Sequence, residues 1–257
     1  MTDFLIQYAA GTGPLATEAL RRVLPDAREL FADESASLVR TGRKLRSADS
    51  LAFANNAFRV IAKVPRGKLP AAVRRLAGQV PRVDLEPAGR QGFRVMAQLD
   101  GRLTAIDRAA RAELERALAA KVRARVTSRG GGAEYWVIGR KELGELLLAQ
   151  RLPKQRARKP AAGALAPELA SMLVAASRPD QRDRFLDPFA GSGALITARL
   201  TGPARRLDYV DRRLPELRPD LPGALVRGGR VRLFDGDARR LTMIDDHDVD
   251  VIVTDPP

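Results

Sequence analysis

The chain of 257 residues contains no cysteine and a single histidine. The lack of cysteine excludes disulfide bonds and thiolate metal sites. The opening residues, MTDFLIQYAAGTGP, have no basic segment, and Gly and Pro interrupt their apolar run, which argues against a signal peptide. No other apolar run approaches the length of a membrane span. We therefore expect a soluble cytoplasmic protein that neither contacts a membrane nor holds a metal.

What the chain has in excess is positive charge, and it is unevenly placed. The net charge is +14, and residues 1–160 carry 31 Lys and Arg against 16 Asp and Glu, whereas residues 161–257 carry 14 against 15. Of the 45 basic residues 38 are Arg, which suits bidentate contacts to phosphates. The first part of the chain is therefore predicted to bind a polyanion such as a nucleic acid.

Length and a hydrophobic content of 45% suit two ordinary domains. Residues 1–150 are predicted to form an α+β domain with antiparallel strands. Its expected strands are FLIQYAA, FRVMAQLDG and EYWVIGR; its expected helices are GTGPLATEALRRVLPD, LPAAVRRLAGQV and a segment opened by Thr104 and Asp107. Residues 30–41 are predicted to form a hairpin, and residues 50–65 a helix or a strand that ends at Pro65.

Residues 151–164 have no apolar periodicity and contain two prolines. We interpret them as an interdomain linker, although an ordered loop that touches RNA is an alternative. From residue 165 to residue 257 helices and short strands alternate: PELASMLVAAS is a predicted helix, and RFLDPF, RLDYVD, RVRLFDGD and VDVIVTD are predicted strands. This alternation predicts an α/β domain with a parallel sheet.

The most informative segment is RFLDPFAGSGALITARL, residues 184–200, a strand, a glycine turn and a helix. In such sheets ligands bind beyond the carboxyl ends of the strands, where a glycine turn lets the backbone approach them. A dinucleotide site would place a third glycine where Ile196 stands, and the Gly-Lys-Ser/Thr of a P-loop is absent. Asp187 at the strand end is unsuited to a phosphate and suits a ligand with an amine or a positive charge.

The segment DPFAGSG resembles motif I of class I S-adenosylmethionine-dependent methyltransferases, in the form found in RNA methyltransferases with an N-terminal THUMP domain. Three later segments agree in order: LDYVD, FDGDA and the final DPP, which resembles the start of motif IV. The resemblance implies a Rossmann-like methyltransferase domain over residues 165–257 and a THUMP-like RNA-binding region over residues 1–150. It is specific from Leu165 onward and looser before it.

This resemblance implies S-adenosylmethionine as the cofactor. Asp211 lies where the family binds the ribose, and Asp237 lies where it binds the adenine amine, with Asp235 as a competitor for that role. The cofactor-binding residues that the resemblance implies are Asp187, Phe189, Ala190, Gly191, Gly193, Asp211, Asp237 and Ala238.

Catalysis is assigned by the same resemblance to Asp255, Pro256 and Pro257. An exocyclic base amine is a poor nucleophile because its lone pair is delocalised into the ring. A carboxylate and a backbone carbonyl can hold its two hydrogens and direct the lone pair at a methyl sulfonium, while the prolines fix the turn. Reaching the amine requires taking the base out of its stack.

The leading prediction is therefore methylation of an exocyclic amine in RNA, guanine N2 in tRNA, with ribosomal RNA as another possible partner. A DNA adenine N6-methyltransferase and a non-catalytic RNA-binding module are the alternatives. Class I sheets normally have seven strands and we count four here, so we expect a fragment, a partner that completes the sheet, or a decayed relative.

Three aromatic and histidine positions have two interpretations each. His247 lies in the acidic run DDHDVD, which favours a solvated loop over a metal site. Tyr135 and Trp136 could stack on bases, but their place in an apolar strand favours the core for at least one of them.

Overall fold

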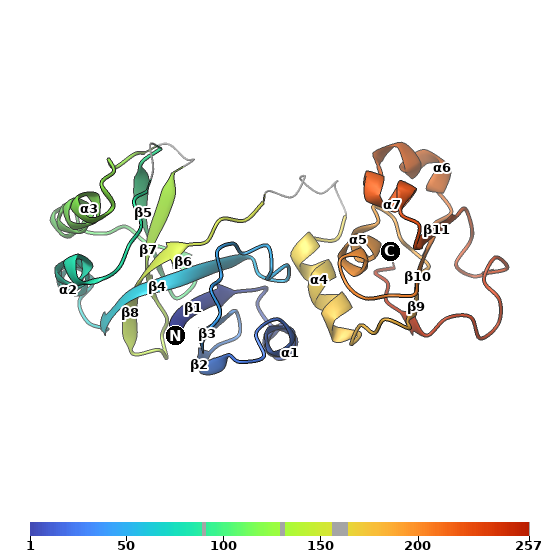
Figure 1. The fold of residues 1–257 in the computed structure, drawn as a ribbon, viewed down its shortest axis with the longest axis horizontal. Coiled ribbons are helices and arrows are strands. Elements are labelled where there is room, and N and C mark those ends of the chain that lie inside the picture. Colours follow the sequence, from blue (N-terminus) through green and yellow to red (C-terminus); the bar gives the residue numbers. More distant parts are fainter. Residues whose placement is uncertain (89–90, 129–131, 156–163, 257) are drawn as a thin grey trace. The chain divides into compact units, whose positions relative to one another are not determined.

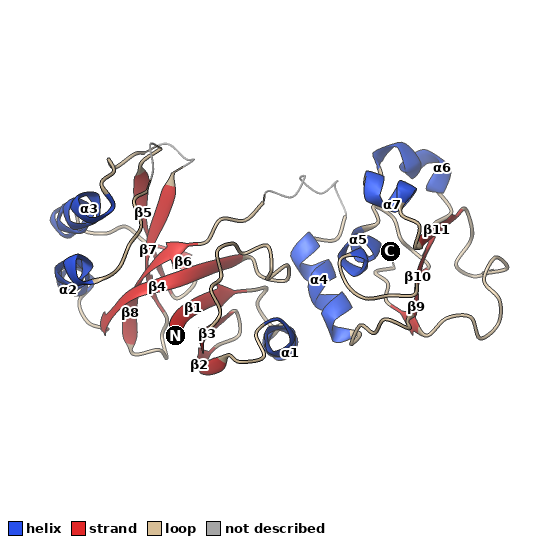
Figure 2. Ribbon diagram, viewed as in Figure 1, coloured by secondary structure: helices blue, strands red, loops and turns tan. Residues whose placement is uncertain are grey.

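The computed structural model describes residues 1–88, 91–128, 132–155 and 164–256. The chain divides into two compact units, shown in Figures 1 and 2. Unit 1 consists of Met1–Gln7, Asp26–Ala48 and Asn56–Pro153, and unit 2 consists of Tyr8–Pro25, Asp49–Asn55 and Lys154–Pro257. Unit 2 thus includes two segments from the first quarter of the chain as well as its C-terminal part.

Unit 1 is built on an eight-stranded sheet with the order β2-β3-β1-β4-β8-β7-β5-β6. Neighbouring strands are antiparallel except β5 and β7, which are parallel and are joined by a helical crossover. The strands are β1 (Thr2–Gln7), β2 (Arg28–Ala32), β3 (Ala36–Thr41), β4 (Asn56–Pro65), β5 (Phe93–Leu99), β6 (Arg102–Leu103), β7 (Ala133–Gly139) and β8 (Glu145–Arg151).

Two helices, α2 (Leu69–Gln79) and α3 (Arg108–Val122), pack against this sheet. Val73 and Leu76 of α2 and Leu114 and Leu118 of α3 are fully buried with the apolar side chains of β5 and β7. The carboxylate of Asp107 accepts a hydrogen bond from the Ala110 N–H at 3.0 Å and so caps α3. A short 3-10 helix, Val80–Arg82, follows α2.

Unit 2 contains a four-stranded sheet in which all strands are parallel, with the order β11-β10-β9-β12. The strands are β9 (Arg184–Asp187), β10 (Arg206–Val210), β11 (Val231–Phe234) and β12 (Val251–Ile252). The helices are α1 (Gly13–Val23), α4 (Pro167–Ala176), α5 (Ala194–Leu200), α6 (Leu214–Leu217) and α7 (Gly223–Arg227), with a 3-10 helix at Arg218–Asp220.

One face of this sheet forms the core of unit 2. Phe185, Leu207 and Tyr209 point to this face and are fully buried against apolar side chains of α4, α5 and α7. Alternate residues of the same strands, such as Leu186 and Asp208, point to the other face. Helix α1 packs against α4, which is how an N-terminal segment joins this unit.

The mixed α/β fold class, the parallel sheet after residue 165 and the 30–41 hairpin are confirmed. Within the segment 50–65, residues Asn56–Pro65 form a strand, β4, which ends at Pro65 as expected. The expectation of purely antiparallel strands before residue 150 is wrong for β5 and β7, because α3 carries the chain across between them. The central part of the predicted linker, residues 156–163, lies outside the described residues.

Candidate active site

Four aspartates stand at one edge of the parallel sheet of unit 2. Each strand contributes one: Asp187 ends β9, Asp211 directly follows β10, and Asp237 and Asp255 lie three residues beyond β11 and β12. Because the carboxyl ends of parallel strands meet at one edge, these side chains come together. All four line one pocket with a volume of about 570 Å³.

The glycine turn between β9 and α5 forms one wall of the pocket. Gly191 has φ +49° and Gly193 has φ +75°, a left-handed conformation that side chains rarely adopt. A Cβ atom at Gly193 would collide with Leu225, which is buried in the core. Gly193 is the N-cap of α5 and is not among the residues that line the pocket, whereas Phe189, Ala190 and Gly191 line it.

Asp187 is the most deeply buried of the four carboxylates, with 1% of its surface exposed. Burial, together with the nearby charges of Asp211 and Asp255, raises its pKa to about 6, although a hydrogen bond from the Phe189 N–H opposes the shift. A carboxylate that is buried among other carboxylates favours a positively charged ligand. Such a perturbed group in a pocket is typical of a functional site.

Asp211 is already bonded to the turn that it faces. Its Oδ2 accepts from the Gly191 N–H at 2.8 Å and its Oδ1 from the Arg213 N–H at 2.8 Å. Asp237 is more exposed, and the Arg239 guanidinium bonded to it holds the pKa of its carboxyl far below the usual range. Arg239 itself is exposed at the pocket rim.

Asp255 and Pro256 lie at the open side of the pocket and are both exposed. The predicted catalytic Pro257 lies outside the described residues. Ala238 lines the pocket beside Asp237, whereas the competing Asp235 does not line it.

Sequence reasoning missed several residues of this pocket. Leu165, Ser192, Leu195, Arg212 and Arg213 also line it. Tyr209 does not line the pocket but contacts its wall, because its hydroxyl donates a hydrogen bond to the Gly191 carbonyl at 2.6 Å. Its position in an apolar strand gave no signal of this contact. Elsewhere, Tyr135 is fully buried and Trp136 is half-buried, which confirms that at least one of the two lies in the core.

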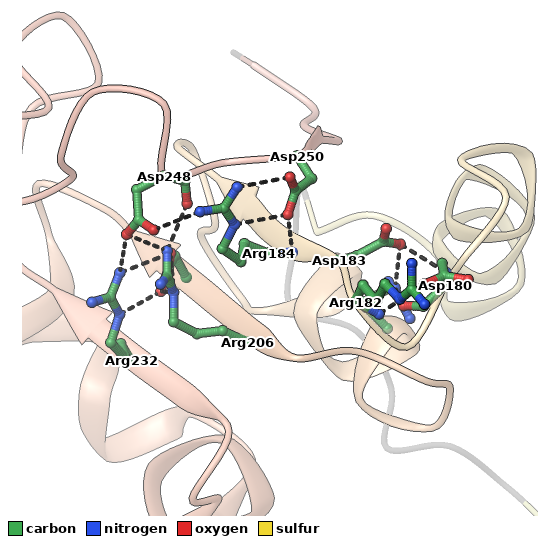
Figure 3. A network of polar contacts seen from close by, with 10 residues as sticks. Asp180, Arg182, Asp183, Arg184, Arg206, Arg232, Asp248 and Asp250 are labelled. Carbon is green, nitrogen blue, oxygen red and sulfur yellow. Dashed lines mark hydrogen bonds and ion pairs between the residues drawn. The ribbon is translucent and has the colours of Figure 1, made fainter.

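The opposite edge of the sheet carries a network of ion pairs, shown in Figure 3. Arg184, Arg206 and Arg232 stand near the starts of β9, β10 and β11. Arg206 and Arg232 both pair with Asp208, at 2.9 and 2.7 Å, and the side chain of Asp208 is fully buried. Asp248 and Asp250, from the segment that leads into β12, pair with these arginines and fasten that segment to the sheet.

Among the residues that the structure describes, no three His, Cys, Asp or Glu side chains are arranged to hold a metal ion. No helix in the described ranges is both long and apolar enough to cross a membrane.

Comparison with known proteins adds to this geometry. Residues 154–208 match the model of the UPF0020 family, described as an RMKL-like methyltransferase domain. No curated protein sequence matches the chain.

Solved structures match over the whole chain at low sequence identity. TrmN from Thermus thermophilus matches with a TM-score of 0.73 and 22% identity, over 100% of this chain and 79% of that one. A predicted N6-adenine-specific DNA methylase from Listeria monocytogenes gives 0.63 and 14%, over 100% and 80%. An inferred methyltransferase complexed with SAH, SMU.472, gives 0.59 and 12%, over 100% and 80%. The chain therefore has the fold of these proteins, and its residues 154–208 resemble a methyltransferase domain.

Proposed function

We propose that this chain is an S-adenosylmethionine-dependent RNA methyltransferase that acts on an exocyclic base amine, guanine N2 in tRNA. The observation that carries the proposal is the pocket at the carboxyl edge of the parallel sheet. A glycine turn and one aspartate after each of four strands converge there. The match of residues 154–208 to a methyltransferase domain supports this reading.

The residues of the pocket fit S-adenosylmethionine. When bound, this cofactor supplies a methyl group on a positively charged sulfonium, and it also carries an ammonium group. Asp187 and the neighbouring carboxylates favour such a cation, and the glycine turn allows close approach of the backbone. In this proposal Asp211 binds the ribose hydroxyls and Asp237 binds the adenine amine, with Phe189, Ala190 and Ala238 as further contacts.

Asp255 and Pro256 are the residues proposed to hold the target amine. The Asp255 carboxylate and the Pro256 carbonyl can each accept one of the two amine hydrogens, which turns the lone pair away from them. The protein's part in this step is positioning, because a sulfonium needs no acid to leave. As the bond from nitrogen to the methyl carbon forms, the bond from that carbon to sulfur would break, and sulfur would leave as a neutral thioether. The proton that the amine then releases would pass to the Asp255 carboxylate or to water. Both residues lie at the exposed side of the pocket, where an unstacked base could enter.

The RNA is proposed to bind the basic N-terminal part of the chain. Residues 1–160 have an excess of 15 positive charges, most of them from Arg, and residues 161–257 have none. Such an excess attracts a phosphate backbone without regard to sequence. Base choice would then depend on the pocket.

The test is transfer of a radiolabelled methyl group from S-adenosylmethionine to unmodified tRNA, ribosomal RNA and DNA, followed by nucleoside mass spectrometry. Label recovered as N2-methylguanosine in tRNA is the expected result. Label recovered as N6-methyladenine in DNA would overturn the RNA assignment. Binding of tRNA without any transfer, by a chain that also fails to bind S-adenosylhomocysteine, would favour a non-catalytic RNA-binding module.

A matched pair of variants sharpens this test. Asp255→Ala is expected to lower the rate of transfer about a hundredfold, because the amine loses the side-chain acceptor that orients it. Asp246→Ala is the control, since Asp246 is an exposed aspartate of the loop before β12 and does not line the pocket. Equal rates for the two variants would remove Asp255 from the mechanism.

A further inference from the structure

The glycine turn is fastened to the neighbouring strand β10 by three hydrogen bonds. The Ala190 N–H donates to the Val210 carbonyl at 3.1 Å, and the Gly191 N–H donates to the Asp211 carboxylate at 2.8 Å. The Tyr209 hydroxyl donates to the Gly191 carbonyl at 2.6 Å. The N–H and the carbonyl of Gly191 are therefore both held by residues at the end of β10, the N–H by Asp211 and the carbonyl by Tyr209.

Tyr209 is well placed to be a fixed donor. It is fully buried, and its ring lies 3.8 Å from the position that a Cβ atom at Gly193 would occupy. Burial and the charges of Asp211 and Asp187 raise the pKa of its hydroxyl, so the proton stays on the oxygen. The ring thus lies beside Gly193, while the hydroxyl holds Gly191.

Orientation of the Gly191 peptide matters to the pocket because Gly191 and Asp211 are linked. Glycine at φ +49° is free to adopt other conformations, and only its contacts select this one. If the bond to Tyr209 were lost, the Gly191 carbonyl would be left without that donor, and the turn could rotate. Rotation would also release the Gly191 N–H from Asp211, whose carboxylate would then lose one of the two backbone N–H groups that orient it and keep that of Arg213.

We propose that Tyr209 is a positioning residue that holds the glycine turn and Asp211 in the conformation that binds the nucleoside part of the cofactor. The identity of the ligand in this inference rests on the proposed function. The effect of Tyr209 on the glycine turn does not depend on that function. Tyr209 touches no ligand in this scheme, because it acts from beneath through Gly191.

The experiment compares Tyr209→Phe, which removes only the hydroxyl, with wild type by calorimetric titration of S-adenosylhomocysteine. We expect the Kd to rise about five- to tenfold, the usual consequence of losing one buried hydrogen bond. Amide hydrogen exchange of residues 190–193 is expected to accelerate by a similar factor in the absence of any ligand.

Tyr135→Phe is the matched control. Tyr135 is also fully buried in a strand, but it lies in unit 1 and its hydroxyl has no hydrogen-bond partner among the described residues. Its removal should change neither the Kd nor the exchange of residues 190–193. If the role of Tyr209 were merely structural, Tyr209→Phe would have a lower melting temperature than wild type. Its Kd, measured at a temperature well below melting, would be unchanged.

The outcomes separate this inference from the proposed function. An unchanged Kd together with unchanged exchange of the turn in Tyr209→Phe would overturn the inference, even if wild type binds the ligand tightly. Failure of folded wild type to bind S-adenosylhomocysteine would instead count against the proposed function. In that case faster exchange of the turn in Tyr209→Phe would still support the positioning role, and unchanged exchange would still overturn it.

Discussion

The two edges of the parallel sheet of unit 2 use the same residue types in opposite ways. At the amino edge, the buried Asp208 lies between Arg206 and Arg232, so its charge is matched twice. At the carboxyl edge, the equally buried Asp187 has two further carboxylates as its charged neighbours. The first arrangement stabilises the fold, and the second leaves a negative charge for a ligand to neutralise.

The difference shows how one sheet separates a structural task from a binding task. A charge that is paired with opposite charges inside the protein attracts a ligand only weakly. A buried charge without such a partner destabilises the ligand-free protein and binds a cation strongly. The comparison predicts that mutations of the two aspartates change stability with opposite signs.

The largest expected effect is that of Asp208→Ala. The substitution removes the fully buried carboxylate that pairs with both Arg206 and Arg232, and leaves them Asp248 as their shared partner. We expect the free energy of unfolding to fall by about 3 kcal/mol. Urea denaturation at pH 7 measures it. Asp246→Ala, at an exposed loop position, is the control and should change stability little. A loss for Asp208→Ala no larger than that of the control would remove the contrast between the two edges.

Asp187→Asn is expected to have the opposite sign. The amide keeps the shape of the side chain and removes a charge that the pocket disfavours, so the free energy of unfolding of the ligand-free protein at pH 7 should rise by about 1–3 kcal/mol. The affinity for S-adenosylmethionine should fall in the same variant. Thermal melting and calorimetric titration test the two effects, and a variant less stable than wild type would contradict the first.

The pH dependence gives a third test, with its sign set by the raised pKa of Asp187. Its pKa is about 6 in the folded protein, above the 3.8 of an ordinary aspartate in water, so the folded state binds its proton more tightly. The stability that this proton contributes is present below about pH 4 and is lost as the pH rises through about 6. The gap in stability between wild type and Asp187→Asn should therefore be widest at pH 7 and close toward pH 4.

Binding of a cation should show the reverse trend. Protonation of Asp187 removes the charge that attracts the ligand, so the affinity of wild type for S-adenosylmethionine should decline below about pH 6. The affinity of Asp187→Asn should vary less over the same range. Titrations at pH 5, 6 and 7 measure this, and parallel pH profiles for the two proteins would assign the dependence to another group.

The smallest expected effect on stability is that of Arg239→Ala. Arg239 is 82% exposed, and its pair with Asp237 is a surface pair at the rim of the pocket. Such pairs contribute little, so the melting temperature should shift by less than about 2 °C. A much larger shift would mean that the carboxyl edge also depends on internal charge pairs, which would weaken the contrast.

The sequence predicted the strand, glycine turn and helix around residue 190 because each has a local signature. The resemblance to methyltransferases assigned the aspartates after successive strands to cofactor and amine binding, and parallel strands bring their carboxyl ends to one edge. The sequence could not predict the Tyr209 contact to Gly191, because a tyrosine in an apolar strand is typical of any core. The ion pairs of Asp208 depend on strand register, which joins residues far apart in the chain.

The position of α1 has a consequence for synthesis on the ribosome. This helix is complete by residue 23, yet α4, the helix against which it packs, begins only at Pro167. Its buried residues Ala16, Ala19 and Leu20 therefore stay without that partner while more than half of the polypeptide emerges. Unit 1 therefore folds while the apolar face of α1 is still unpacked, and this exposed surface makes the nascent chain more prone to aggregation.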